Sequence, residues 1–274
     1  MSAPKLTVKE TTCKTALVKS GLPNFDYALN PYRGCEHGCI YCYAPSVLRY
    51  KGEKRWGDFV DVRRNMPRIL SKEIRSGIDI GKVGIGTVTD PYQPSEDRYE
   101  VTRNCLNVLL KKDFPVSIQT KSTLVLRDLN LLKKFSRCEV GFTITSIDER
   151  TRREYEPLSS SFEEKLEAIR ELSDSGITTW VFLGPIMPYI TNREDDLEKL
   201  IDELSGNVSY ILIDRLRLKR GIWENIESFL REYSPDLIPI YKDILYSKDE
   251  YFSEVKLKII RLCEEYNINY EVLF

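Results

Sequence analysis

Short β-forming runs alternate with longer amphipathic segments along most of the 274-residue chain, and this alternation constrains the fold more than any other feature. Within residues 96–112, for example, Val101, Cys105, Val108 and Leu109 share one face of a helix. Alternating strands and helices indicate βαβ units, right-handed crossovers and a parallel sheet. We expect strands at 27–31, 83–89, 116–120, 140–145, 178–183, 208–213 and 268–273. We expect helices at 96–112, 124–135, 162–175, 194–204 and 249–266.

The pattern contains six or seven strand–helix units, which is too few for a closed eight-stranded barrel. We therefore predict an α/β fold, either a partial (βα)6 TIM-like barrel or an open, curved parallel sheet. The chain is predicted to be one domain, with an N-terminal extension at 1–24, a core barrel at 25–215, and helices and a final strand at 216–274. Because ligands gather at the carboxyl ends of the strands in both architectures, polar residues directly after a strand are candidate site residues.

Charge is nearly balanced, with 41 Lys and Arg against 42 Asp and Glu and a net charge of −1. A chain of this composition lacks the overall basic character typical of nucleic-acid-binding domains, so any such contact must come from a local patch. A basic run follows the expected strand at 208–213 and consists of Arg215, Arg217, Lys219 and Arg220, with Arg231 beyond it. Its ordinary interpretation is a solvated surface; its functional one is phosphate or nucleic-acid binding.

No secretory or membrane-spanning segment is evident. The first ten residues carry charges and no apolar core. The most apolar run, 177–190, is broken by Gly184, Pro185 and Pro188 and is shorter than the ~20 residues of a spanning helix. We expect a cytoplasmic protein with no membrane partner. A disulfide framework is not expected for seven cysteines in that reducing compartment, so clustered cysteines there suggest metal.

Three cysteines cluster on the loop after the expected first strand, at 27–31. Cys35, Cys39 and Cys42 are separated by three and then two residues, and two glycines allow the loop to turn tightly. Three soft ligands within eight residues can wrap one iron–sulfur cube. Because ordinary electron carriers use four cysteines, this loop would leave one iron open to an exogenous ligand.

Two other interpretations of the cysteine loop are open. One is a zinc site completed by His37 or a distant cysteine, although no second Cys-x2-Cys knuckle is present. The other is a set of unligated core thiols, for which a loop rich in glycine and tyrosine is a poor environment. As the only histidine, His37 cannot belong to a catalytic set of histidines.

The cysteine spacing, with an aromatic residue before the last cysteine, resembles the radical S-adenosylmethionine (SAM) superfamily. The segments NPYRGCEHGCIYCYAP (30–45) and GTVTDPYQPSE (86–96) resemble its spore photoproduct lyase-related, DNA repair photolyase-like branch. Weaker similarity covers 120–132, 143–148 and 184–192. The resemblance implies a partial (βα)6 barrel with its cluster loop after the first strand.

The resemblance also implies a chemistry. Cys35, Cys39 and Cys42 would hold a [4Fe-4S] cluster, and SAM would chelate the open iron. Reductive cleavage of SAM would give methionine and a 5′-deoxyadenosyl radical. This radical would then abstract hydrogen from an unidentified substrate. A reductase or a ferredoxin-type protein would supply the electron.

The same resemblance also predicts which residues form the site. Tyr41 is expected against the adenine, and Tyr43 is expected near the site as a catalytic tyrosine in radical transfer; both could instead simply pack around the cluster. Thr87, Thr89 and Asp90 are expected to contact the methionine ammonium of SAM. The alternative for Asp90 is that Asp-Pro only opens a turn.

Further residues lie after later strands. Lys121 is expected to pair with the SAM carboxylate or a substrate anion, or else to be an ordinary exposed lysine. Contacts with SAM are also expected from residues that could equally serve strand-end turns, namely Thr145, Ser146, Gly184 and Pro185.

One position departs from the lyase pattern. Thr87 aligns with a cysteine that donates a hydrogen atom in spore photoproduct lyase, and threonine has no weak S–H bond. Cys105 and Cys263 lie on apolar helix stripes and are interpreted as core residues. Two alternatives to the enzyme with an unidentified substrate therefore stay open: a non-catalytic iron–sulfur or zinc protein, and a nucleic-acid repair or modification lyase.

Overall fold

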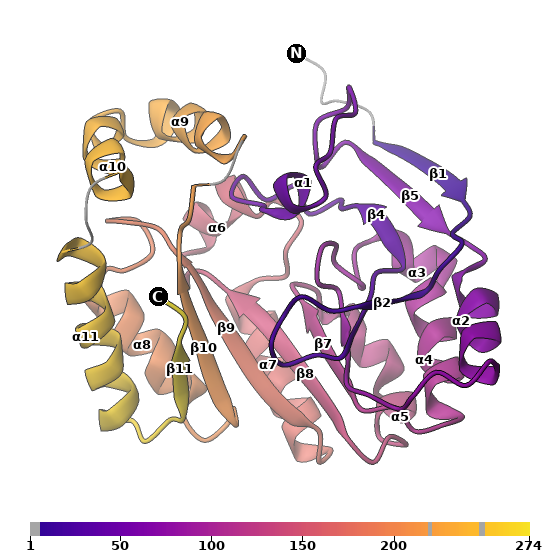
Figure 1. Cartoon of the computed structure of the whole chain (residues 1–274). Coiled ribbons are helices and arrows are strands. Elements are labelled where there is room, and N and C mark those ends of the chain that lie inside the picture. The colour runs from indigo at the N-terminus through magenta and orange to yellow at the C-terminus, as the bar shows by residue number, and fades with distance from the viewer. Residues whose placement is uncertain (1–5, 219–220, 247–249) are drawn as a thin grey trace.

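An open sheet of eight strands forms the centre of the molecule (Figure 1). A computed structural model gives the structure, which describes residues 6–218, 221–246 and 250–274. In spatial order the strands are β11 (Tyr270–Val272), β10 (Tyr210–Arg215), β9 (Thr178–Ile186), β8 (Cys138–Ile144), β7 (Val116–Thr120), β6 (Val83–Ile85), β3 (Tyr27–Leu29) and β2 (Leu17–Lys19). Every neighbouring pair is parallel except β2–β3. Since β11 and β2 do not pair, the barrel stays open, and the predicted partial (βα)6 barrel is confirmed.

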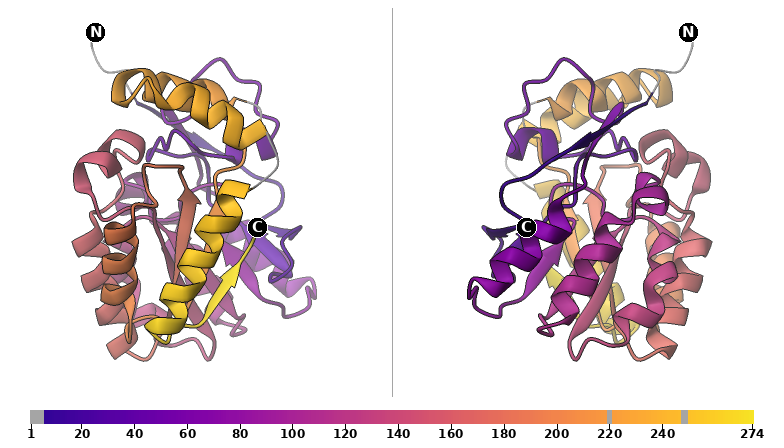
Figure 2. Two further views of the ribbon diagram at one scale, coloured as in Figure 1. Left: turned by 90° about the vertical axis from the view of Figure 1, so that its left-hand side faces the viewer. Right: turned by 90° about the vertical axis from the view of Figure 1, so that its right-hand side faces the viewer.

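Helices pack on the outer face of this sheet (Figure 2). They are α2 (Met66–Arg75), α4 (Val101–Leu110), α5 (Leu129–Leu132), α7 (Phe162–Asp174), α8 (Glu194–Leu204) and α11 (Glu250–Glu265). Alternation along each strand builds the core, because Ile118 and Val140 point to the helices and are fully buried. Their neighbours on the inner face are polar, as Gln119 and Thr143 are.

The expected strand at 83–89 is shorter than predicted, because β6 ends at Ile85. Gly86 adopts φ +92°, and a Cβ there would lie 2.5 Å from Pro91 Cδ and 2.8 Å from Gln119 O. Only glycine fits this turn, which carries residues 87–90 across the carboxyl ends of the strands.

The expected helix at 96–112 is broken into α3 (Ser95–Tyr99) and α4. Glu100 has φ +48° at the break. The cause is the buried Glu96 carboxylate, which accepts hydrogen bonds from the N–H groups of Thr102 (2.9 Å) and Arg103 (3.1 Å) at the start of α4. The expected helix at 124–135 is likewise a 3-10 helix, η1 (Thr123–Asp128), followed by the short α5.

The N-terminal extension contributes strands that the sequence pattern did not predict. Besides β2, it provides β1 (Thr7–Thr11), which pairs parallel with β5 (Phe59–Arg63); β5 pairs antiparallel with β4 (Tyr32–Gly34). This three-stranded sheet lies at the carboxyl-terminal end of the barrel, near α1 (Ala44–Val47) (Figure 1). It holds the chain directly before Cys35.

A second apolar cluster covers the same end of the barrel. It is formed largely by α6 (Glu149–Tyr155), α9 (Ile222–Tyr233) and α10 (Leu237–Tyr246), with Tyr41 from the cysteine loop packed among them. Tyr155 and Tyr241 are fully buried there. The C-terminal region therefore packs directly against the cysteine loop. None of the helices in the described ranges has the length and apolar character needed to span a bilayer.

Candidate functional site

A cavity of about 90 Å³ lies at the carboxyl ends of β6, β7 and β8. The cysteine loop forms one wall, and the strand-end segments form the other. The lining residues are Cys35, His37, Cys39, Cys42, Tyr43, Ala44, Gly86, Thr87, Val88, Thr89, Asp90, Gln119, Thr120, Lys121 and Thr143. The structure thus brings the three cysteines of the motif together with four of the predicted strand-end residues.

The three thiols are poorly placed to carry charge by themselves. Burial raises the pKa of Cys35 and Cys39 above the ordinary thiol value, and Asp90 adds to this at Cys35. Burial also raises the pKa of Cys42. The backbone N–H of Ala44, the charge of Lys121 and the side chain of Trp56 lower this pKa but do not cancel the effect of burial. A coordinated metal deprotonates such thiols outright, so these cysteines would carry their charge as metal ligands.

The geometry fits a multi-iron cluster. Among the residues that the structure describes, no three His, Cys, Asp or Glu side chains converge closely enough to share one metal ion. The cysteines instead line a common cavity, as a cube requires, because each thiolate bonds a different iron. The buried indole N–H of Trp56 lies near Cys42 but forms no hydrogen bond with any acceptor among the described residues. Thiolate and sulfide sulfurs are acceptors that would satisfy it.

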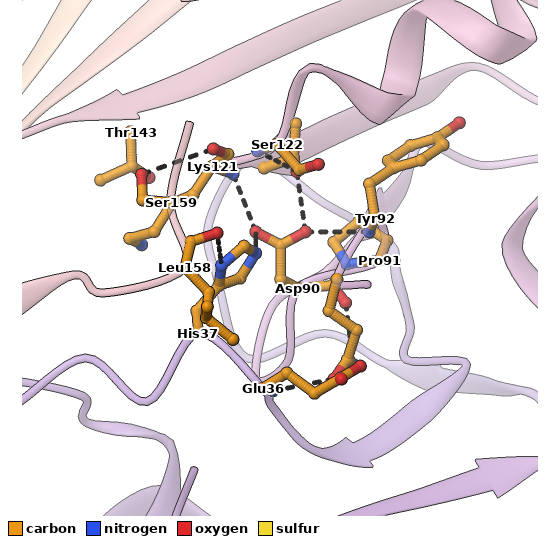
Figure 3. A network of polar contacts seen from close by, with 12 residues as sticks. Glu36, His37, Asp90, Pro91, Tyr92, Lys121, Ser122, Thr143, Leu158 and Ser159 are labelled. Atoms are coloured by element: carbon orange, nitrogen blue, oxygen red, sulfur yellow. Dashed lines mark hydrogen bonds and ion pairs between the residues drawn. The ribbon is translucent and has the colours of Figure 1, made fainter. Parts of the chain in front are cut away.

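Asp90 is the hub of the cavity wall (Figure 3). Its Oδ1 accepts hydrogen bonds from Tyr92 N (2.8 Å) and Thr120 Oγ1 (2.7 Å). Its Oδ2 accepts from Lys121 N (2.8 Å) and lies 3.2 Å from Nε2 of His37. Burial opposes ionisation, but His37 and the hydrogen bond from Thr120 outweigh it and lower the pKa of Asp90 to about 2.

These contacts bear on the predicted role of Asp90. Its four acceptor positions are all used by the protein, so the carboxylate joins the cysteine loop to the ends of β6 and β7. Contact with the methionine ammonium stays a prediction. The same carboxylate explains His37, whose Nδ1 lies 2.9 Å from Leu158 O and which is 1% exposed: the ring links the cysteine loop to Asp90 and to the segment after α6.

Thr87 and Thr89 differ in the hydrogen-bonding capacity that their hydroxyl groups have left for a ligand. The Thr89 hydroxyl donates to Gly34 O (2.7 Å) and accepts from Gln93 Nε2 (3.1 Å), so both of its functions are used. The Thr87 hydroxyl accepts from Asn30 Nδ2 (2.9 Å), and its O–H remains able to donate or accept within the cavity. Of the two threonines, Thr87 is the one with capacity for a ligand.

Lys121 is a cation at the cavity without a carboxylate partner among the described residues. Its Nζ lies 5.7 Å from the centroid of the Tyr41 ring. Tyr43 lines the cavity, is 46% exposed, and donates through its hydroxyl to Thr87 O at 2.5 Å. Both residues predicted to be catalytic therefore lie at the cavity.

Tyr41 lies behind the cavity rather than in its lining. Its hydroxyl donates to the buried carboxylate of Glu156, whose Oε2 lies 3.8 Å from Nζ of the buried Lys165. Sequence reasoning missed Glu156 and Lys165. A signal was present, because Lys165 falls on the same helical stripe as Phe162, Leu166 and Ile169, where a lysine requires a buried partner.

Four predicted SAM contacts lie outside the cavity lining: Thr145, Ser146, Gly184 and Pro185. The buried Thr145 hydroxyl has no hydrogen-bond partner in the described structure. Ser146 Oγ accepts from Asp148 N (3.0 Å) in a turn. Gly184 allows close approach to β10, since a Cβ there would lie 2.6 Å from Asp214 O.

The predicted basic patch is largely engaged within the chain. Arg217 pairs with Asp214 (3.1 Å), Arg231 pairs with Glu227 (2.8 Å), and Arg215 lies over the Phe252 ring. Lys219 and Arg220 lie outside the described residues.

A larger cavity of about 600 Å³ occupies the opposite end of the sheet. It is lined by Cys138 and contains the 2.6 Å ion pair between Lys82 and Glu139. None of the three clustered cysteines lines it, so size alone does not mark the site. Cys105 and Cys263 are fully buried in the core, as predicted.

Comparison with known proteins agrees with the geometry. Residues 29–204 match the family described as the radical SAM superfamily. The chain belongs to this superfamily. An uncharacterized protein of Methanocaldococcus jannaschii, MJ0683, is 31% identical over 94% of the chain and 96% of its own length. More distant is the spore photoproduct lyase of Clostridium acetobutylicum, 25% identical over 68% of the chain and 54% of that protein.

Solved structures show the same fold. Spore photoproduct lyase complexed with a dinucleoside spore photoproduct has a TM-score of 0.74 at 19% identity, over 98% of this chain and 82% of that one. Streptococcus suis SuiB bound to S-adenosylmethionine has a TM-score of 0.59 at 13% identity, over 90% of the chain and 50% of SuiB. At these identities the likeness concerns the fold. Membership of the superfamily supports an enzyme that uses an iron–sulfur cluster and SAM.

Proposed function

We propose that this protein is an enzyme that holds a [4Fe-4S] cluster on Cys35, Cys39 and Cys42 and uses it to generate a 5′-deoxyadenosyl radical from SAM. The radical abstracts a hydrogen atom from a substrate not yet identified. The observation that carries the proposal is the single cavity that unites the three cysteines of the motif with Thr87 and Lys121. Superfamily membership supports the same chemistry.

When bound on the three cysteines, the cluster would supply one electron to the sulfonium of SAM and so allow its C5′–S bond to break. The residues of the chain bind and orient. Three cysteines leave one iron open, and Lys121 presents an unpaired cation at the cavity to the carboxylate of SAM. Asp90 and His37 hold the two walls of the cavity in register, since their contact joins the cysteine loop to the strand ends.

Hydrogen return is the point at which the cavity differs from the lyase pattern. Apart from the three clustered cysteines, the described lining contains no thiol, and Thr87 stands at the aligned position. Tyr43 offers a phenolic O–H for radical transfer, because its phenol lines the cavity and is partly exposed. We therefore favour a reaction other than repair of spore photoproduct.

A nucleic-acid repair or modification lyase is the second candidate. It is supported by the fold likeness to spore photoproduct lyase in complex with a dinucleoside. It requires binding to DNA or RNA that weakens as salt rises. Absence of any such binding at low salt, measured by fluorescence anisotropy, would count decisively against it. The proposed location is the cytoplasm, whose reducing conditions suit an exposed iron.

The test is anaerobic reconstitution with iron and sulfide, followed by dithionite and SAM. We expect four irons and four sulfides per chain by the stoichiometry of the cluster, and 5′-deoxyadenosine production that Cys42→Ala abolishes. Cys138→Ala, at the opposite end of the sheet, is the matched control and keeps activity. Zinc without sulfide, or equal 5′-deoxyadenosine from Cys42→Ala and the unmodified protein, would refute the proposal.

A further inference from the structure

A basic loop projects beyond α1 at the same end of the molecule as the cysteine loop. We define the basic loop as residues 49–55, between α1 and β5, which rises above α1 in Figure 1 and at the top of both views in Figure 2. Its exposed cations are Arg49, Lys51, Lys54 and Arg55. Glu53 is its one acidic residue. None of the four cations forms an ion pair with any residue in the described ranges.

The basic loop stands on a rigid aromatic base. Tyr50 stacks on Phe59 with ring centroids 5.1 Å apart, and Trp56 packs edge-on against both rings, at 5.8 and 5.6 Å. Arg33, whose side chain is 48% exposed, lies 5.6 Å from the Tyr50 ring and adds a fifth cation to this face. The charges are therefore presented from a fixed platform.

The base of this loop contacts the cysteine loop at two points. Trp56 lies close enough to Cys42 for its side chain to lower the pKa of that thiol. Gly57 approaches Gly38 so closely that a Cβ on Gly57 would lie 3.0 Å from Gly38 Cα. The outer, charged surface is therefore only a few residues from the cysteines that would hold the cluster. The rate of electron transfer falls steeply with distance, and an electron that enters at this surface has only a short distance to travel to the cysteines.

The basic loop does not line the cavity. SAM and substrate must occupy the cavity, whereas an electron can enter from any side on which a carrier comes close to the cluster. A macromolecular substrate held on the basic loop would not yet have placed its reacting group in the cavity. A carrier docked on the basic loop does not need to place any group in the cavity.

We propose that the basic loop is the docking surface for an acidic one-electron carrier protein, which passes its electron past Trp56 to the cluster. The inference rests on the proposed function, because only a cluster that must be reduced needs a carrier. In the transfer, one electron leaves the reduced carrier, which is oxidised by one equivalent, and enters the cluster held by the three cysteines. No bond forms or breaks.

Charge complementarity identifies the occupant. Five unpaired or weakly paired cations attract an acidic protein, steer its approach and lose this effect as salt screens them. Electron-transfer encounters are small and short-lived, so a single charged loop is an adequate surface.

The test compares three reconstituted proteins: the unmodified chain, the triple variant Lys51→Glu, Lys54→Glu and Arg55→Glu, and a matched triple variant Lys111→Glu, Lys112→Glu and Lys134→Glu. The matched positions are exposed and form no ion pairs among the described residues. They directly follow α4 and α5 and precede the starts of β7 and β8, at the other end of the sheet. Photoreduced flavodoxin is the carrier. Cluster reduction is followed by loss of visible absorbance and by electron paramagnetic resonance, at low and high salt.

We expect flavodoxin to reduce the basic-loop variant at least about tenfold more slowly at low salt, with no change in the matched variant. Dithionite, which needs no docking, should reduce all three proteins equally and support equal 5′-deoxyadenosine formation. Equal flavodoxin rates in all three proteins would overturn the inference. So would a basic-loop variant that loses binding to duplex DNA in anisotropy while its reduction rate is unchanged.

Failure of the proposed function gives a different result. In that case dithionite yields no 5′-deoxyadenosine from any of the three proteins, including the unmodified chain. Success with dithionite combined with equal flavodoxin rates removes only the docking surface.

Discussion

The hydroxyl of Tyr41 donates a hydrogen bond to the buried carboxylate of Glu156, 115 residues further along the chain. Tyr41 directly precedes Cys42, so this bond ties the cysteine loop to the segment after α6. The N–H of Ile40 adds a second tie by donating to Tyr155 O at 3.2 Å. Lys165 completes the arrangement, 3.8 Å from Glu156 and 3.0 Å from Thr143 O. The cysteine loop is thus anchored from beneath by a buried ion pair.

Lys165→Met is expected to lower the free energy of unfolding by about 3–5 kcal/mol, because it leaves Glu156 buried without its cation. Chemical denaturation of the protein before reconstitution measures this. Lys199→Met, at an exposed position of α8, should change stability by less than about 0.5 kcal/mol. Equal stabilities of the two variants would show that the ion pair does not anchor the loop.

Glu149 makes stability depend on pH. Hydrogen bonding from Arg152, helped by Arg153 and opposed by burial, lowers the pKa of Glu149 from 4.5 to about 2. Because the folded-state pKa is the lower one, this stability is present above about pH 4.5 and is lost as the pH falls toward 2. We expect a loss of about 1 kcal/mol, discounted for solvent screening of a partly exposed pair.

Glu149→Gln should flatten the stability profile between those pH values, measured by denaturation of the apoprotein. Glu163→Gln, at an exposed position near the start of α7, should leave the profile as it is. A steep acid loss that persists in Glu149→Gln would contradict the prediction.

Trp56→Phe removes the indole N–H but keeps an aromatic ring packed against Tyr50 and Phe59. Hydrogen bonds to cluster sulfurs make reduction easier, so their loss should shift the reduction potential to a more negative value. Redox titration of the reconstituted protein gives the shift, and iron content should stay the same. Trp223→Phe, on α9, is the control. An unchanged potential in Trp56→Phe would mean that the N–H does not reach the sulfurs.

Lys121→Met keeps the apolar stem over Tyr41 and removes the cation. We expect SAM to bind about tenfold more weakly, which corresponds to about 1.4 kcal/mol. Equilibrium binding to the reconstituted protein measures it, and Lys133→Met at the other cavity provides the comparison. Unchanged affinity would remove Lys121 from the SAM site.

The sequence alone determined the class of fold and the centre of the site. Alternating β-rich and helical runs predicted the parallel sheet, because periods of two and 3.6 residues reflect which side chains face the core. The spacing of Cys35, Cys39 and Cys42 predicted a shared metal group, since ligands within eight residues can reach one centre whatever the rest of the chain does. Thr87 and Lys121 were predicted from their places at the ends of expected strands together with the family resemblance.

Tertiary structure decided what surrounds that centre. The pairing of β1 with β5, the use of all acceptor positions of Asp90, and the anchoring of Tyr41 on Glu156 join residues roughly 30 to 115 positions apart. No local pattern encodes such contacts, because they depend on the path of the whole chain and on which polar groups burial leaves needing partners. For the same reason, Thr145 and Gly184 come at the ends of expected strands yet lie outside the cavity lining, and Gly184 lies within β9.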